Sequence, residues 1–122
     1  MSIVTWDSPD WLEFISYAQA WKNNTQLRLS SSALDKAMDP NYLAIVGMGD
    51  RAVPHILEQM RSELELGRID HWFVALWAIT KANPVPEASR GKVKEMAKAW
   101  LAWGEDRGLV SARLGTIFSS TW

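Results

Sequence analysis

The sequence contains no cysteine among its 122 residues. Disulfide bonds, thiolate metal sites and cysteine nucleophiles are therefore excluded together. An excess of charge of one sign is also lacking, because 13 Lys and Arg residues face 14 Asp and Glu residues, which leaves a formal net charge of -1. No general attraction to nucleic acid or to anionic lipid follows from such a balance.

Long hydrophobic runs are missing as well. The longest one covers residues 72–79, far fewer than the roughly 20 residues that a membrane-spanning helix needs. Residues 1–10 have neither the basic start nor the apolar stretch of a secretory signal, so we expect a cytoplasmic protein. With 48% hydrophobic and 22% charged residues, the chain has the composition of a globular protein with a substantial core.

Apolar residues recur at helical spacing through most of the chain, which predicts an all-α fold. Helices are expected to begin near residues 8, 32, 39, 50, 70 and 87–89, where N-cap residues or prolines mark helix starts. We predict one domain over residues 1–122, a compact bundle of five to six helices around a central helical hairpin. Residues 1–7 form a lead-in and residues 109–122 a possible docking tail.

The central hairpin is predicted from residues 47–82. Its first helix carries one apolar stripe, formed by Val53, Ile56, Leu57, Met60 and Leu64. The second helix includes the apolar run 72–79, which by periodicity alone could also be a buried strand. Its Ala and Leu residues and the capping residue Asp70 favour helix. Because this helix is apolar on nearly every side, we expect it in the middle of the molecule.

Two resemblances rest on this stretch. The letters I-V-G-M-G-D-R-A-V-P-H-I-L-E-Q-M, followed by an apolar second helix, resemble a HEAT-type helical pair. Residues 21–108 also resemble a family of small bacterial all-helical proteins without an assigned function. That family usually has His-Pro where this chain has Asp39-Pro40. The resemblance implies a helical fold and a bacterial origin, and it ends near Gly108.

Candidates for catalysis or metal binding are few. His55 is expected on the solvent side of its helix and His71 in a first turn, and no Glu-x-x-His pair accompanies either one. The serines at 30–32 lack a nucleophile elbow, and the glycines at 47 and 49 lack the rest of a phosphate loop. Glu58, Glu63 and Glu65 are interpreted as a solvated face. We therefore predict a protein that is not an enzyme and that has no cofactor and no metal site.

Tryptophan is unusually frequent, with eight residues. Five of them fall where a core is expected: Trp11, Trp21, Trp77, Trp100 and Trp103. The other three lie at termini or at a helix start and are candidates for a partner surface: Trp6, Trp72 and Trp122.

The tail carries much apolar surface and only one charge, Arg113. It either folds back on its own domain or docks on another chain, and we favour docking as an amphipathic helix through Leu114, Ile117, Phe118 and Trp122. The predicted function is therefore a protein-interaction module, a regulator, inhibitor or adaptor of bacterial or bacteriophage origin. The predicted partner is a protein of unknown identity or a second copy of this chain, and no binding to a membrane is expected. The alternative is a nucleic-acid-associated accessory protein that uses Arg90, Lys92, Lys94 and Lys98 beside two tryptophans.

Overall fold

The computed structural model describes residues 8–24 and 33–110. Within these residues the chain forms six α-helices, two short 3-10 helices and no strand, so the predicted all-α class is confirmed. The α-helices are α1 (Pro9–Lys22), α3 (Ala33–Ala37), α4 (Pro40–Gly47), α5 (Val53–Leu66), α6 (Phe73–Thr80) and α7 (Val93–Asp106). The 3-10 helices are η1 (Gly49–Ala52) and η2 (Glu87–Ser89).

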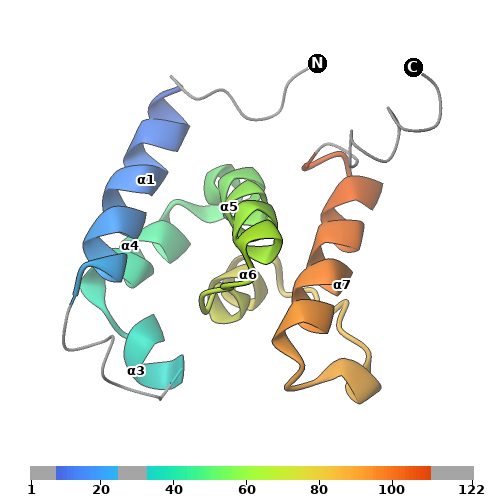
Figure 1. Ribbon diagram of the computed structural model, residues 1–122. Coiled ribbons are helices and arrows are strands. Elements are labelled where there is room, and N and C mark those ends of the chain that lie inside the picture. The colour runs from blue at the N-terminus through green and yellow to red at the C-terminus, as the bar shows by residue number, and fades with distance from the viewer. Residues whose placement is uncertain (1–7, 25–32, 111–122) are drawn as a thin grey trace.

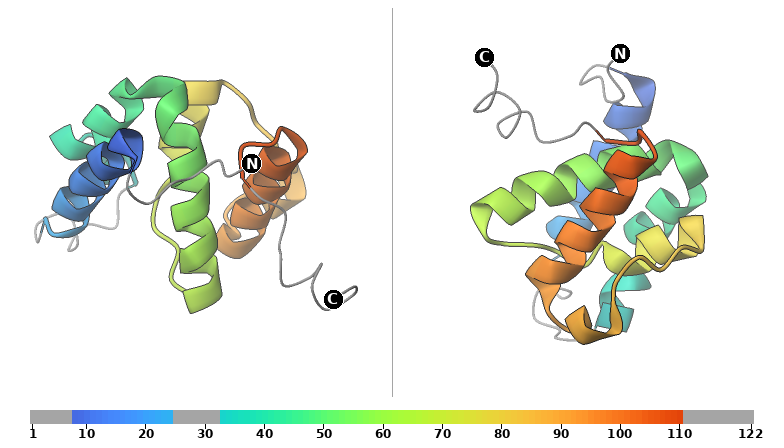
Figure 2. Two further views of the ribbon diagram at one scale, coloured as in Figure 1. Left: turned by 90° about the horizontal axis from the view of Figure 1, so that it is seen from above. Right: turned by 90° about the vertical axis from the view of Figure 1, so that its right-hand side faces the viewer.

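The helices α5 and α6 lie in the middle of the molecule. Figure 1 shows α1, α3 and α4 on one side of this pair and α7 on the other, and the view from above in Figure 2 has α5 between α1 and α7 as well. Helix α1 packs on α4, α4 packs on α6, and α5 packs on α7. The central placement of the pair agrees with the prediction from residues 47–82, but α6 exposes the face of Val74 and Trp77 and is not enclosed on all sides as expected. The HEAT-type character of the pair stays a prediction.

Two of the predicted helix starts are confirmed. The Ser8 side chain accepts a hydrogen bond from the Trp11 amide, and the Asp39 side chain accepts hydrogen bonds from the amides of Asn41 and Tyr42. Each of these caps is followed by a proline in the first turn. In both places the local sequence alone supplies the capping group and the fixed φ.

The predicted caps Asp50 and Asp70 are wrong. Asp50 lies inside η1, whose backbone continues directly into α5, so the Val53 amide already donates to the Asp50 carbonyl. The Asp70 carboxylate accepts from the next residue, His71, and from Lys22, while α6 begins only at Phe73. The Asp70 carboxylate, which the sequence pattern assigned to a cap, is therefore engaged by Lys22 of α1 instead.

Two helices end at or shortly before a glycine, and a third glycine interrupts a helix that was predicted to be continuous. Gly67 (φ 77°) ends α5 and Gly108 (φ 70°) follows α7, each in the left-handed region that a side chain disfavours. Gly91 (φ 83°) interrupts the chain before Val93. The long helix expected from Glu87 or Ser89 is therefore split into η2 and the shorter α7.

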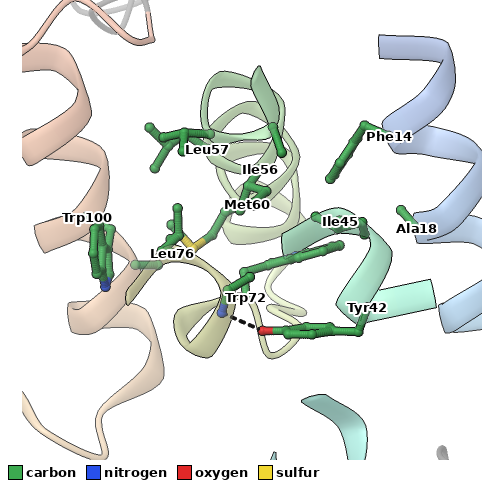
Figure 3. Packing of buried hydrophobic residues seen from close by; sticks show 14 of the residues in the cluster. Phe14, Ala18, Tyr42, Ile45, Ile56, Leu57, Met60, Trp72, Leu76 and Trp100 are labelled. Atoms are coloured by element: carbon green, nitrogen blue, oxygen red, sulfur yellow. Dashed lines mark hydrogen bonds between the residues drawn. The ribbon is translucent and has the colours of Figure 1, made fainter. Parts of the chain in front are cut away.

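The core is built on α5 and closed by residues from both sides (Figure 3). Ile56, Leu57 and Met60 of the predicted stripe are completely buried. The other large, completely buried side chains include Phe14, Ile45, Trp72 and Leu76. Trp21 and Trp100 are buried, as predicted, whereas Trp11 and Trp103 pack against the core while partly exposed.

The burial predicted for the two tryptophans of the apolar run is wrong in both cases. Trp77, predicted to be core, is 54% exposed, and Trp72, predicted as a candidate surface residue, is 0% exposed. The helix α6 is covered only on the face of Ala75 and Leu76, so a run that is apolar all round must leave one face outside. Trp72 precedes the helix and turns into a ring cluster, with centroids 4.9 Å from Trp21 and 5.7 Å from Phe14.

The buried face of α7 is rotated relative to the predicted stripe. Its buried residues are Ala97, Trp100, Leu101 and Gly104, whereas Val93 is exposed and Met96 and Trp103 lie at the edge. Gly104 explains the rotation. A Cβ atom at this position would lie 2.5 Å from Leu57 Cδ1 and 3.2 Å from Val110 Cγ1, so with a larger residue at this position the Leu57 side chain would have to shift.

Candidate protein-binding grooves beside α7

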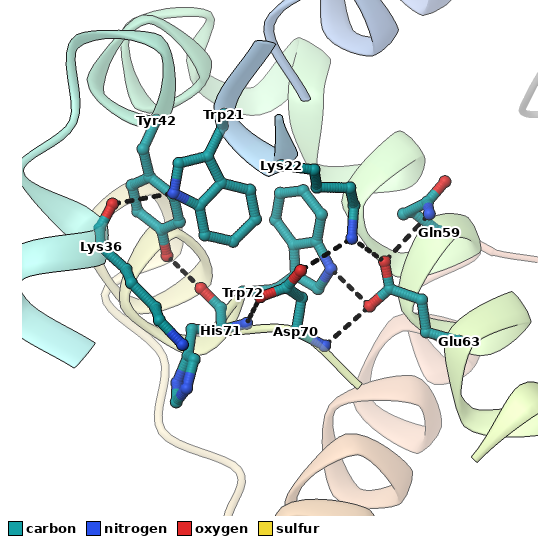
Figure 4. Close-up of polar contacts among 9 residues, drawn as sticks. All are labelled: Trp21, Lys22, Lys36, Tyr42, Gln59, Glu63, Asp70, His71 and Trp72. Atoms are coloured by element: carbon teal, nitrogen blue, oxygen red, sulfur yellow. Dashed lines mark hydrogen bonds and ion pairs between the residues drawn. The ribbon is translucent and has the colours of Figure 1, made fainter. Parts of the chain in front are cut away.

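Glu63, which was predicted to lie on a solvated face, accepts several hydrogen bonds. That prediction is wrong, because Glu63 is only 5% exposed. Its carboxylate accepts hydrogen bonds from Lys22 Nζ (2.7 Å), the Trp72 indole N–H (2.9 Å) and the Asp70 amide (2.9 Å), as Figure 4 shows. Glu58 is also mostly covered and pairs with Arg61 at 2.6 Å.

Lys22 is the cation of this network. Its Nζ lies 2.7 Å from Glu63 and 2.9 Å from Asp70, and 5.4–5.7 Å from the ring centroids of Trp72 and Trp21. Burial pushes the pKa of Asp70 upward, but the hydrogen bond and the charge of Lys22 outweigh it, so the pKa lies below its usual value. The network therefore ties the end of α1 to α5 and to the segment before α6.

A second set of hydrogen bonds connects α4 to the same segment. The Tyr42 hydroxyl donates to the His71 carbonyl (2.7 Å) and accepts from the Ala75 amide (2.8 Å). Burial raises the pKa of this hydroxyl far above its ordinary value. The Trp21 indole N–H donates to the Lys36 carbonyl at 2.9 Å. Because these groups are engaged with one another, we assign them a structural role.

His55 is buried rather than on the solvent side, so that prediction is also wrong. It is 4% exposed, and its ring lies 5.6 Å from the ring of Trp11 and 5.9 Å from that of Phe14. Its Nδ1 has no hydrogen-bond partner among the described residues. Burial lowers the pKa of His55, against the opposing charges of Asp10 and Glu58. Helix α5 is covered on several faces, so a position off the main stripe is buried as well.

His71 is partly exposed, and its pKa is lowered first by burial and then by the charge of Lys36. Within residues 8–24 and 33–110, no three His, Cys, Asp or Glu side chains gather as a metal ion would require. Among the helices described, none has the length and apolar character needed to cross a membrane.

An open apolar groove lies between α6 and α7, and we call it the α6/α7 groove. Its volume is about 550 Å³. The apolar lining consists of Phe73, Val74, Trp77, Val85, Met96 and Trp100. Val74 and Trp77 are 41% and 54% exposed, so the face of α6 that the core leaves uncovered forms one wall. The buried edge of Trp100 belongs to the opposite wall.

The charge near this groove is positive. Arg90 lines it, and Lys81 Nζ lies 5.0 Å above the Trp77 ring. Neither cation forms an ion pair with a carboxylate in the described part of the chain. Lys81 occupies the left-handed region (φ 60°) at the end of α6, a conformation that turns the chain toward the connector before η2.

A second groove, the α5/α7 groove, lies on the other flank of α7. Its volume is about 360 Å³, and its apolar lining is Leu64, Leu101 and Ala102. Charged side chains surround this lining: Arg61, Glu65, Lys98 and Glu105. At 100° per residue, Ala102 and Glu105 lie on the side of α7 opposite Met96 and Trp100 of the α6/α7 groove, so the two grooves face different directions.

The basic segment proposed for nucleic acid is divided between these grooves. Arg90 lines the α6/α7 groove, whereas Lys98 lines the α5/α7 groove. Lys92 and Lys94 are exposed at the start of α7. The four cations are therefore not gathered on one surface. The predicted partner-binding residues Leu114, Ile117, Phe118 and Trp122 lie outside the described residues, and of the apolar tail only Leu109 and Val110 are described.

Sequence reasoning missed Val74 and Trp77 as surface residues. One signal could have found them: a helix packed on a core buries a stripe of about three positions in seven. Eight consecutive apolar residues exceed what one such stripe can cover, so a short helix carrying them must expose several.

Comparison with known proteins adds no relative. No protein-family model, no curated protein and no solved structure matches this chain significantly. The resemblance to a small bacterial helical family consequently stays a prediction.

Proposed function

We propose that this protein is a non-enzymatic interaction module that binds a segment of another protein in the α6/α7 groove. The observation that carries the proposal is the exposure of Val74 and Trp77 beside an apolar groove. Exposed aromatic side chains in a concave apolar site are typical of binding hot spots. Binding of a partner segment in this groove is consistent with a regulator, inhibitor or adaptor. We propose that it acts in the cytoplasm of a bacterium and that α5 and α6 form a HEAT-type pair.

The occupant that fits the groove is an amphipathic helix with acidic residues beside its apolar face. A groove between two helices accepts side chains spaced at i, i+3 or i+4, and i+7 of a third helix. Arg90 and Lys81 lie at its rim without a described carboxylate partner. Acidic side chains on the partner would supply the missing charges and orient the helix.

Trp77 is the natural anchor of such a complex. Covering the exposed half of an indole removes on the order of 100 Å² from water, which contributes about 2.5 kcal/mol. The Lys81 ammonium above the ring adds a cation–π contact that holds the ring in place before binding. A pre-positioned aromatic side chain loses little conformational entropy when the partner docks.

The nucleic-acid alternative has less support. It rests on Arg90, Lys92, Lys94 and Lys98, two of which line different grooves. A phosphate backbone would need to contact both flanks of α7 to reach them all, and the formal net charge of -1 adds no general attraction.

Selection of helical peptides from a display library against the full chain tests the proposal. We expect enrichment of peptides with three apolar residues at helical spacing and flanking Asp or Glu. Val74→Glu and Trp77→Ala should each raise the dissociation constant of a selected peptide at least tenfold. Arg90→Glu should weaken the binding of acidic peptides more than that of neutral ones. Ala102→Glu, an exposed position in the other groove, is the matched control and should change binding less than twofold.

Two results would reject the proposal. One is a set of selected peptides that bind the Val74→Glu variant as tightly as the wild type, which would place the binding surface elsewhere. The other is tight, salt-dependent binding of a short DNA or RNA strand that is lost on charge reversal of Lys94 and Lys98, which would support the nucleic-acid alternative.

A further inference from the structure

The α5/α7 groove begins where the described chain ends. After Gly108 the chain turns back, held by a 2.8 Å hydrogen bond from the Leu109 amide to the Gly104 carbonyl. The Val110 side chain is buried. It abuts Gly104 beside Leu57, since a Cβ atom at Gly104 would contact both side chains. Val110, the last described residue, therefore lies beside the seam between α5 and α7.

The groove continues this seam along α5. Arg61 and Leu64 are four and seven residues after Leu57, so all three lie on the same face of α5. Arg61 and Leu64 line the groove together with Leu101 and Ala102 of α7. Beyond the position beside Gly104 that Leu57 and Val110 share, α5 thus continues into an apolar surface that no described residue covers.

We propose that residues 111–122 of this same chain occupy the α5/α7 groove, with Leu114 over Leu64 and Leu101. The rise from Leu57 to Leu64 along α5 is about 10 Å. Four extended residues, from Val110 to Leu114, span up to about 13 Å, so the segment reaches the groove without any change in the described structure. Ile117 and Phe118 then cover the rest of the apolar lining.

The composition of the segment matches this groove better than the other one. Its large apolar residues are Leu114, Ile117, Phe118 and Trp122, and its single charged side chain is Arg113. Arg113 falls near the start of the groove, where Glu105 lies. In the α5/α7 groove the cations Arg61 and Lys98 are balanced by Glu65 and Glu105. The α6/α7 groove has the cations Arg90 and Lys81 and no carboxylate in its lining, so its charge would repel Arg113, and it opens on the opposite flank of α7. This inference is independent of the proposed function.

Trypsin cleavage after Arg113 in the full-length protein tests the docking. A docked segment is protected, so we expect release of the fragment that begins at Leu114 to be slow in the wild type. Ala102→Glu places a charge in the groove and should accelerate release at least tenfold while leaving the helical circular dichroism unchanged. Val74→Glu, in the other groove, is the control and should change the rate less than twofold. Equal rates in the wild type and in Ala102→Glu would overturn the inference.

Disulfide trapping distinguishes the same chain from a second copy, and the absence of cysteine makes it specific. The pair Ala102→Cys with Thr116→Cys should form an intrachain bond under mild oxidation, seen as a monomer of altered mobility on a non-reducing gel. The pair Val74→Cys with Thr116→Cys is the control and should remain reduced. A disulfide-linked dimer would show a second copy as the occupant, and cross-linking no faster than the control would show an empty groove. Either result overturns the inference.

Discussion

The two sides of the central helices are closed in different ways. Toward α1 and α4, rings and charges interlock: Trp72 lies among Trp21, Tyr42 and Phe14, and its indole N–H binds the buried carboxylate of Glu63. Toward α7, the contact is a narrow apolar seam at Leu57 and Gly104, with an open groove on each flank. The side toward α1 and α4 is closed by buried rings and charges, whereas the side toward α7 leaves apolar surface exposed.

Trp72 and Trp77 show what this difference teaches. They are five residues apart in one apolar run, and their residue type predicts the same behaviour for both. Trp72 is completely buried with its polar atom bonded, whereas Trp77 is half exposed with a lysine ammonium above its ring. The role of each tryptophan depends on what lies opposite it, and residue type does not reveal that.

The largest expected effect contrasts these two residues. Trp72→Ala should lower the free energy of unfolding by about 3–5 kcal/mol, because it empties a buried site of a large aromatic residue. Trp77→Ala should lower it by less than about 1 kcal/mol, as is usual for a surface position. Urea denaturation followed by circular dichroism measures both. If the two variants lost equal stability, the division into a closed side and an exposed side would be wrong.

Breaking the ion network tests the α1 side more narrowly. Lys22→Met keeps most of the side-chain stem but leaves Glu63 and Asp70 without their shared cation, and we expect a loss of about 2–3 kcal/mol of unfolding free energy. Arg51→Met is the matched control, since its pairs with Asp10 and Glu13 are exposed and surface pairs contribute little. Equal losses in the two variants would show that burial of the network contributes nothing.

Gly104→Ala tests the seam toward α7. Alanine at a helix position is favoured over glycine by about 1 kcal/mol, but the added methyl group meets Leu57 and Val110, and overpacking costs about 1–3 kcal/mol. We therefore expect a net loss on the order of 1 kcal/mol by thermal denaturation. A stabilised variant would mean that the seam is loose enough to accept a methyl group.

The smallest expected effect is the pH dependence that His55 gives to the α1 side. Its pKa in the folded protein is lowered by burial, so between that pKa and its ordinary value of 6.5 the unfolded chain binds more protons. The contribution of neutral His55 to the unfolding free energy is present in full above about pH 6.5 and is lost as the pH falls through the folded-state pKa of His55. His71, whose pKa is also lowered, acts in the same direction.

His55→Leu should therefore reduce the loss of unfolding free energy between about pH 7.5 and about pH 5.5. The effect of His71 remains in the variant, so the dependence should become weaker without vanishing. An unchanged pH dependence would indicate that the buried ring of His55 takes up its proton as easily as in the unfolded chain.

The sequence by itself determined the helical elements and most of their limits, because those signals are local. A cap such as Ser8 or Asp39 and a terminating Gly67 act within one turn, and an apolar stripe shows which positions of one helix face inward together. The same local signals predicted that residues 47–82 form the central pair, in agreement with the structure. They could not predict the grooves, because each groove is formed by two helices.

Only the tertiary structure decided which polar residues are buried and which apolar residues are left outside. Glu63 is buried because Lys22, 41 residues earlier in the chain, brings a compensating charge to it. His55 is buried because α1 supplies the rings of Trp11 and Phe14 beside it. Trp77 is exposed because no described helix covers that face of α6. Periodicity describes one helix at a time, whereas burial depends on how many neighbours surround it and on which sides.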